Sequence, residues 1–320
     1  MKSIFKFAVL VLVIGLLSMA IIGCEADEEG VDEEEEVDEE EKGTVVVSSK
    51  TFPEALTQGW MTYYLLEDRG YDVVNEIGLG EVAVIRPALE SGEIDLYWEY
   101  TGTALFNVMG YEGDELPAGE EETFQTIHDY DLEENNIKWL DYAPANNTFV
   151  LFVTEETQQE YGWETLSDLA EYARDQGGAY GSIATPAEWV ERDDGMVPFQ
   201  EHYDFEFAEV VEVELGLAYR AVEQEEALIG VGDATEGRII KYDLQILDDD
   251  KDFFPAYNAA PTVRQEVFEA NPELEDLLKE ISSRLDLETQ TELNLRTAVD
   301  EEDPEDVARD FLVEEGLIEE

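Results

Sequence analysis

The stretch that most constrains the fold is Glu93–Leu105, which reads EIDLYWEYTGTAL. Ile94, Leu96 and Trp98 alternate with polar residues, which is the period-2 pattern of a short strand. A Thr-Gly-Thr turn follows, and helical spacing of apolar residues begins directly after it. The segment predicts a strand that ends at a helix N-terminus, where free backbone N–H groups bind anions readily. A glycine turn beside a core tyrosine is the simpler alternative.

Strand patterns and helix patterns alternate along the rest of the chain. Thr44–Ser49 is a run of mostly β-branched residues, typical of a strand buried on both faces of a parallel sheet. Pro53 then stands where a first helical turn begins. The alternation predicts an α/β fold with parallel sheets and binding loops at the carboxyl ends of the strands. Further strands are predicted at Tyr71–Ile77, Thr148–Val153, Tyr180–Ala184, Ala227–Val231 and Leu244–Leu247, and helices at Glu81–Glu90, Leu166–Arg174, from near Thr235 and within Glu266–Leu317.

The N-terminal residues 1–23 have the pattern of a signal peptide. Lys2 and Lys6 form a basic region, and the apolar run Ala8–Ile22 is short for a membrane span. Ile-Ile-Gly-Cys, ending at Cys24, resembles the bacterial lipobox, so we expect a lipidated Cys24 that anchors the protein to the outside of the cell membrane. An uncleaved anchor and an ordinary secretory signal are the alternatives. Residues 24–43 are mostly Asp, Glu, Gly and Val and predict a disordered tether.

The acidic charge of the chain limits its partners. It holds 18 Lys and Arg against 81 Asp and Glu, a formal charge of −63, and the acids extend far beyond the tether. Such a surface repels nucleic acid and anionic lipid headgroups. It suits molar salt, where the Debye length is about 3 Å. We therefore expect a halophile's protein with no nucleic-acid partner.

Signatures of catalysis and of metal binding are poor. The folded part holds no nucleophile motif and no phosphate-binding loop, and the single cysteine, Cys24, allows no internal disulfide. His128 and His202 are isolated and lack the spacing of metal ligands. Carboxylate pairs such as Asp193 and Asp194 are too common here to be informative. We expect no metal, no cofactor and no enzymatic activity, with a secreted hydrolase as the alternative.

Cations and aromatic residues at strand ends are the candidate ligand groups. Because positive charge is scarce, Lys50 after the first strand and Arg192 in a Glu-Arg-Asp-Asp-Gly segment stand out. With a hydroxyl they can hold a carboxylate, and aromatic faces can hold a quaternary ammonium group. Alternatively, the aromatic residues are core and the cations pair with nearby acids. The carboxylate candidates are Lys50, Thr103 and Arg192, and the aromatic candidates are Tyr100, Phe149 and Tyr257.

Five segments together resemble one protein family in order and approximate spacing. The family comprises the substrate-binding proteins of glycine betaine, choline and proline betaine ABC importers. The resemblance extends from about Val45 to Leu317, and the second and fifth segments are the most specific. The segments are SSKTFPEA, SGEIDLYWEYTGTAL, NNTFVLFV, ATEGRI and FPAYNAAPTVR.

The resemblance implies a two-lobed, type II periplasmic-binding-protein fold with the ligand between the lobes. Residues 44–147 plus 253–320 would form lobe 1 and residues 148–252 lobe 2. Crossovers near Ala145–Thr148 and Phe253–Asn258 would form the hinge. The resemblance places Lys50, Thr103 and Arg192 at carboxylate contacts, Tyr100, Phe149 and Tyr257 in an aromatic cage, and Asn147 beside the ammonium group.

Two positions depart from the family pattern. Phe149 replaces the usual Tyr, so a hydroxyl is lost, and Asp233 stands where an aromatic cage wall is usual. A buried Asp233 is costly unless a ligand cation accompanies it.

We predict a monomeric binding protein that delivers an osmoprotectant, foremost glycine betaine, to an ABC permease. The same fold binding choline, ectoine or another small cation is the nearest alternative. A surface sensor without a permease is a further one.

Overall fold

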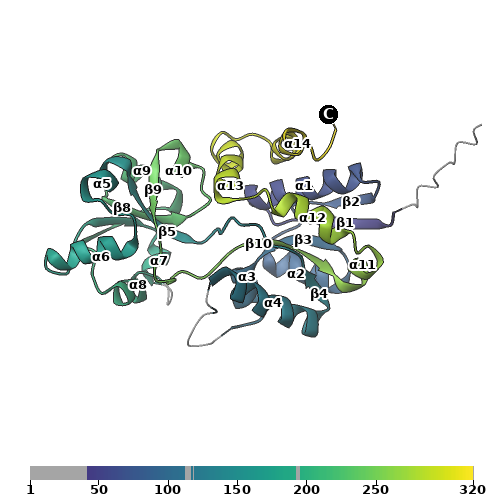
Figure 1. Cartoon of the computed structure of the whole chain (residues 1–320), viewed down its shortest axis with the longest axis horizontal. Coiled ribbons are helices and arrows are strands. Elements are labelled where there is room, and N and C mark those ends of the chain that lie inside the picture. Colours follow the sequence, from purple (N-terminus) through teal and green to yellow (C-terminus); the bar gives the residue numbers. More distant parts are fainter. Residues whose placement is uncertain (1–41, 112–116, 118, 192–194, 320) are drawn as a thin grey trace, which may run out of the picture. The chain divides into compact units, whose positions relative to one another are not determined.

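The strands of the protein form two separate mixed sheets. The computed structural model describes residues 42–111, 117, 119–191 and 195–319. Within these residues two five-stranded sheets have the orders β2-β1-β3-β10-β4 and β7-β6-β8-β5-β9 (Figure 1). The strands are β1 (Thr44–Ser48), β2 (Asp72–Glu76), β3 (Leu96–Tyr100), β4 (Ile137–Trp139), β5 (Phe149–Thr154), β6 (Ser182–Thr185), β7 (Glu209–Glu212), β8 (Ile229–Asp233), β9 (Leu244–Leu247) and β10 (Ala259–Arg264).

The two sheets share one pattern of strand directions. β1 is parallel to β2 and β3, and β6 is parallel to β7 and β8. One antiparallel strand is inserted in each sheet: β10 between β3 and β4, and β5 between β8 and β9. β5 and β10 are the strands that follow the two passages of the chain between the sheets. The predicted α/β class with mostly parallel sheets is confirmed.

Helices cover both faces of each sheet. On β1, Val45 and Val47 pack with α1, α12 and α14, whereas Val46 packs with the core beside α2, α3 and α4. On β5, Leu151 and Val153 pack with α6 and α8, whereas Phe152 packs with α9 and α10. Alternate side chains of one strand thus enter different cores, as the period of 2 requires. The helices are α1 (Pro53–Asp68), α2 (Val82–Ser91), α3 (Thr101–Asn107), α4 (Gly119–Asn135), α5 (Glu155–Tyr161), α6 (Leu166–Asp175), α7 (Ala187–Glu191), α8 (Met196–Tyr203), α9 (Leu215–Glu223), α10 (Arg238–Lys241), α11 (Gln265–Ala270), α12 (Leu274–Ser282), α13 (Leu287–Asn294), the π-helix η1 (Leu295–Val299) and α14 (Pro304–Glu314).

The two passages between the sheets lie side by side and are bonded to each other. Asn146 and Asn258 form an antiparallel bridge. The Asn147 N–H donates to the Tyr257 carbonyl at 3.2 Å, and the Asn258 side chain donates to the carbonyl of Ala143 at 3.1 Å. The paired segments coincide with the two crossovers expected from the sequence.

Most expected elements are present with small shifts at their ends. Pro53 is the first residue of α1, as its missing N–H favours. α10 begins only at Arg238, because residues 234–237 form a turn that precedes it. The sequence analysis missed β4, β7 and β10. β10 contains Pro261, which argues against a central strand because proline cannot donate to the ladder.

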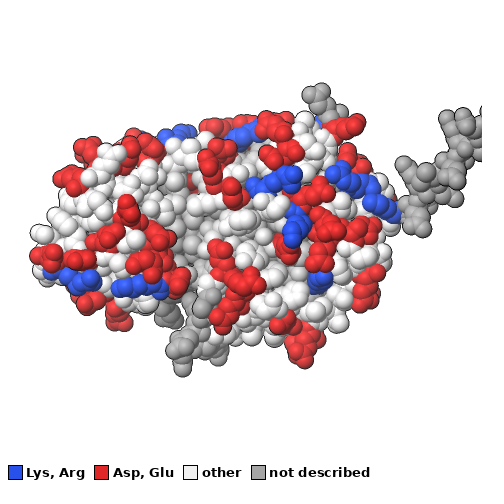
Figure 2. Space-filling model, in the orientation of Figure 1, with Lys and Arg blue, Asp and Glu red and all other residues white. Residues whose placement is uncertain are grey.

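Acidic side chains are spread over the visible face of the molecule and outnumber basic ones there (Figure 2). Figure 2 shows Asp and Glu over the visible face of the helices around both sheets, with Lys and Arg only in isolated groups. Within the described ranges, no helix has both the length and the apolar character needed to cross a membrane.

Candidate functional site

Candidate ligand residues of the first sheet stand where β1 and β3 end. Lys50 follows β1, Tyr100 is the last residue of β3, and Thr103 lies in the first turn of α3. β1 and β3 are parallel neighbours, so their carboxyl ends meet at one edge of the sheet. The Lys50 ammonium lies 4.9 Å from the centroid of the Tyr100 ring.

Lys50 is buried and has a partner within the fold. Its ammonium forms an ion pair with Glu99, and the two side chains are 3% and 0% exposed. Glu99 also accepts hydrogen bonds from the Tyr97 hydroxyl at 2.8 Å and from the Tyr100 backbone N–H at 2.7 Å. A solute carboxylate at Lys50 would therefore share the ammonium with Glu99.

Tyr100 is a buried residue, and its hydroxyl already forms a hydrogen bond within the fold. It donates to Glu54 Oε1 at 2.7 Å, and its ring centroid lies 5.7 Å from that of Phe52. Burial and the neighbouring Glu54 carboxylate raise the pKa of the Tyr100 hydroxyl well above its usual value. The phenol therefore keeps its proton and remains a donor.

Two candidate residues of the second sheet face each other across a strand pair. Phe149 at the start of β5 is the register partner of Asp233 at the end of β8. Opposite residues of an antiparallel pair point to the same face of the sheet. The backbone around Asp233 is fixed because its carbonyl accepts from the Tyr219 hydroxyl at 3.1 Å and the Ala234 N–H donates to Thr148 at 2.9 Å.

The crossovers supply two further candidates, Asn147 and Tyr257. They are held together by the backbone bond described above, and the Tyr257 ring packs directly on the backbone of Gly102, next to Thr103. The Asn147 Oδ1 atom is buried and accepts no hydrogen bond from the described residues. Since buried polar atoms are nearly always bonded, Oδ1 is available to a ligand or water.

A cavity of about 360 Å³ lies between elements of both sheets. Of the candidate residues it contains Asn147 and Asp233. Its other walls come from the start of α1, the β8–α10 loop and the junction of α13 with η1. These additional lining residues are Phe52, Pro53, Glu54, Thr235, Glu236, Asn294 and Ala298.

Carboxylates dominate the electrostatics of this cavity. Burial, with Glu236 and Glu54 nearby, raises the pKa of Asp233 to about 7. Burial also raises the pKa of Glu54, against the lowering effect of its hydrogen bonds. Glu236 is paired with Arg238 at 2.7 Å. A cation in the cavity would relieve the cost of ionising Asp233.

The structure thus brings some candidates together at the cavity, whereas Lys50, Thr103 and Tyr257 are not among the residues that line it. Asn147 and Asp233 line the cavity, Phe149 pairs with Asp233, and Tyr100 contacts the lining residues Glu54 and Phe52. Arg192 and Cys24 lie outside the described residues.

The sequence analysis gave no role to Glu54 or Asn294. Glu54 could have been found as an acid in a first helical turn next to a predicted ligand segment. No local signal marks Asn294, which is far away in the sequence.

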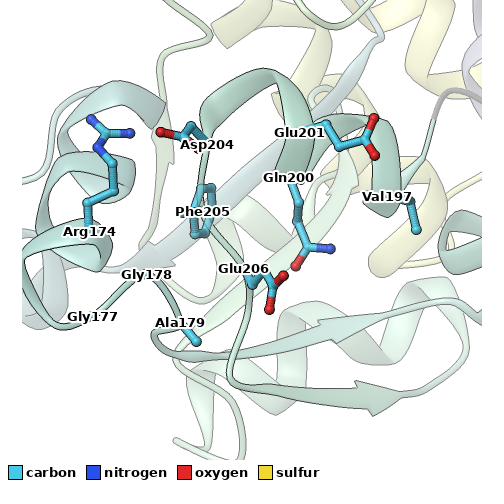
Figure 3. A pocket seen from close by; sticks show the side chains of 10 residues that line it. All are labelled: Arg174, Gly177, Gly178, Ala179, Val197, Gln200, Glu201, Asp204, Phe205 and Glu206. Atoms are coloured by element: carbon cyan, nitrogen blue, oxygen red, sulfur yellow. The ribbon is translucent and has the colours of Figure 1, made fainter.

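A larger hollow, of about 750 Å³, lies on the second sheet's side and holds none of the candidates. Figure 3 shows its lining, in which Arg174 and Gln200 are prominent. Both side chains are bonded within the fold, to the Tyr203 carbonyl at 2.8 Å and the Phe207 N–H at 2.7 Å. The described residues contain no group of three or more His, Cys, Asp or Glu placed to hold a metal ion.

Substitution of Lys50 should destabilise the fold itself. Lys50→Met leaves the Glu99 carboxylate buried without a cation, so we expect a loss of about 3–5 kcal/mol of unfolding free energy. Adding Glu99→Gln should restore most of it, because the amide oxygen still accepts from Tyr97 or Tyr100. Lys279→Met, which removes an exposed pair with Asp141, is the control and should cost far less, because exposed ion pairs contribute little. Denaturant unfolding measures all three, and equal stability of the two single variants would contradict the assignment.

Asp233 should make stability depend on pH. Because its pKa is raised from 3.8 to about 7, the folded state holds a proton that the unfolded state releases. Its stabilising contribution is complete below about pH 4 and is lost as the pH rises through about 7. Asp233→Asn should remove roughly 2–4 kcal/mol of the difference in unfolding free energy between about pH 5 and pH 8. The exposed Asp252→Asn is the control, and an unchanged pH difference in Asp233→Asn would exclude this role.

Comparisons with known proteins agree on one family. The family model described as the substrate binding domain of the ABC-type glycine betaine transport system matches residues 43–314. A glycine-betaine-binding protein of Pseudomonas aeruginosa is 35% identical over 281 residues, covering 86% of this chain and 89% of that protein. The glycine betaine-binding protein YehZ of Escherichia coli is 31% identical over 279 residues, covering 85% and 90%.

A solved structure supports the same assignment. The crystal structure of a glycine betaine/carnitine/choline ABC transporter protein has a TM-score of 0.78 at 26% identity, covering 85% of this chain and 99% of that one. The predicted resemblance is confirmed. The chain belongs to the family of substrate-binding domains of ABC-type glycine betaine transport systems.

Proposed function

We propose that the protein captures a small quaternary ammonium osmoprotectant and delivers it to the permease of an ABC importer. The supporting observation is the cavity bordered by the carboxylates of Glu54, Asp233 and Glu236, which the crossover residue Asn147 also lines. Such a cavity favours a positively charged group. Glycine betaine is the first candidate because the family and two relatives are named for it.

Binding would combine aromatic contact with charge. The faces of Tyr100, Phe149 and Tyr257 would contact the ammonium methyl groups, and Asn147 and Asp233 would face its charge. Lys50, Thr103 and Arg192 would hold the carboxylate of a betaine.

A solute without a carboxylate, such as choline, is the second candidate. Two observations favour it: Asp233 stands beside Phe149 at the cavity, and Lys50 already has Glu99 as its partner. A cation without its own carboxylate would neutralise Asp233 without meeting repulsion from the same side chain.

Capture would involve closure of two lobes about the paired crossovers. We assign residues 44–147 plus 253–320 to one lobe and residues 148–252 to the other, because each set holds one complete sheet. The antiparallel bridge between Asn146 and Asn258 provides a narrow connection about which the lobes can rotate.

Titration calorimetry of the protein in molar salt tests the solute. We expect glycine betaine to bind more tightly than choline, and Asp233→Asn to weaken choline at least about tenfold at a pH above 7, since an ion pair is lost. Betaine should lose less, because its carboxylate is repelled by Asp233. Asp252→Asn is the control, and small-angle scattering should show compaction on binding. Choline binding alone would favour the second candidate, and failure of both solutes would overturn the cage assignment.

Binding proteins of ABC importers work outside the cytoplasm, and we propose that a lipid on Cys24 tethers this one as a monomer beside its permease. Mass spectrometry of the N-terminal peptide from membrane-extracted protein should show an acylated Cys24 as the first residue, as expected for stable anchoring. An unmodified cysteine within a longer peptide would refute the anchor.

A further inference from the structure

One buried carboxylate joins three parts of the fold beside the cavity. Glu54 lies in the first turn of α1 and is 5% exposed. Its Oε1 atom accepts from the Tyr100 hydroxyl at 2.7 Å, at the end of β3. Its Oε2 atom accepts from Thr235 Oγ1 at 2.8 Å and from Asn294 Nδ2 at 2.6 Å. Glu54 thus connects an end of the first sheet to the loop that follows β8 of the second.

Glu54 forms no ion pair with the described Lys and Arg residues, so neutral donors compensate its burial. Three donors and the N-terminus of α1 stabilise a carboxylate there. If the β8–α10 loop moved away from α1, the Thr235 bond would break. The Glu54 Oε2 atom would then lose the hydroxyl donor that Thr235 supplies at the cavity.

We call Glu54 and its three donors, Tyr100, Thr235 and Asn294, the junction. Side-chain amides hold Asn294 in place within it. Gln58 Nε2 donates to Gln290 Oε1, and Gln290 Nε2 donates to Asn294 Oδ1, both at 3.2 Å. With its oxygen satisfied in this way, Asn294 directs its Nδ2 group to Glu54 and to the Thr235 carbonyl, the latter at 2.8 Å. Gln290 therefore helps to fix the orientation of the Asn294 donor group.

Gly237, in the same loop, makes a second, independent contact at this junction. A Cβ atom at Gly237 would lie 2.4 Å from Leu295 Cα and 2.5 Å from Leu295 N. The loop backbone thus packs directly on the start of η1, a π-helix, which is a feature often found at functional sites.

We propose that Glu54 is a positioning residue for solute binding: its carboxylate links the Tyr100 wall to Thr235 when the lobes close over the cavity. This role rests on the proposed function, since it assumes that the cavity receives the solute. The junction contributes to affinity because the Glu54–Thr235 bond stabilises the arrangement in which elements of both sheets border the cavity. Gly237 and η1 set how closely the loop approaches.

Thr235→Val tests the link because it removes the hydroxyl and keeps the shape. We expect about tenfold weaker binding of whichever solute the wild-type protein binds. Thr235→Ser keeps the hydroxyl and should restore affinity to within about threefold. In a Glu54→Ala background, Thr235→Val should have little further effect, since the coupled partner is already missing. Unchanged affinity in Thr235→Val, with only a lower unfolding temperature, would overturn the proposal.

Thr297→Val is the matched control. Thr297 is also buried in this region, but its hydroxyl donates to Leu293 within the same helical segment at 3.0 Å. Its loss should leave affinity unchanged, and an equal loss in both variants would refute a specific role for Thr235.

Hydrogen exchange at α10 separates this proposal from the proposed function. If the wild-type protein bound neither solute, the proposed function would fail, while the junction could still be judged without solute. Thr235→Val should then speed exchange of the Lys241 and Tyr242 amides, and Thr235→Ser and Thr297→Val should not. Equal exchange in all variants would refute the junction itself.

Discussion

The pairing of the two crossover segments is the constraint on which the site depends. The chain leaves the first sheet before β5 and returns to it as β10. Each of these two strands is the antiparallel strand of the sheet that it joins. Because Asn146 and Asn258 lie opposite each other, Asn147 and Tyr257 are brought together as well. The same pairing sets where Phe149 begins β5, and so where Asp233 lies across from it. The candidate ligand groups of the crossovers and of the second sheet are therefore positioned by one short antiparallel contact.

The distribution of buried charge separates structural carboxylates from those available to a ligand. Glu99 is paired with Lys50, and Asp131 with Arg86, so these buried acids are neutralised within the fold. Asp233 forms no ion pair with the described cations, and Glu54 is stabilised by neutral donors instead. An acid without a cation at a cavity is destabilising for the empty protein and stabilising once a cation arrives. The chain has 18 basic residues against 81 acidic ones, and these two acids lack an ion pair with the described cations, which supports the proposed preference for cationic solutes.

Sequence reasoning could predict what local patterns determine. The buried strand Thr44–Ser49 and the proline at the start of α1 have local causes, and they appear as expected. The turn expected after Tyr100 is instead the first turn of α3, which begins at Thr101. The family resemblance added the order of the segments. It could not reveal that Lys50 pairs with Glu99, because acids are so frequent here that no single pair stands out. Nor could it reveal Asn294, which lies 240 residues from its partner Glu54. β10 was missed because Pro261 contradicts the usual preference for central strands.

The surface charge and the cavity act over different ranges. In molar salt the Debye length is about 3 Å, so the exposed acids cannot draw a cation from a distance. Groups at least partly removed from solvent are screened much less, and Asp233 and Glu54 belong to this class. In molar salt, the proposed selection among solutes would therefore occur after entry, through direct contact with these carboxylates and the adjacent aromatic faces. A zwitterion and a simple cation are then separated by whether a carboxylate can be accommodated near Asp233. On this proposal the distinction is made within the cavity, and in molar salt the formal charge of −63 has no part in it.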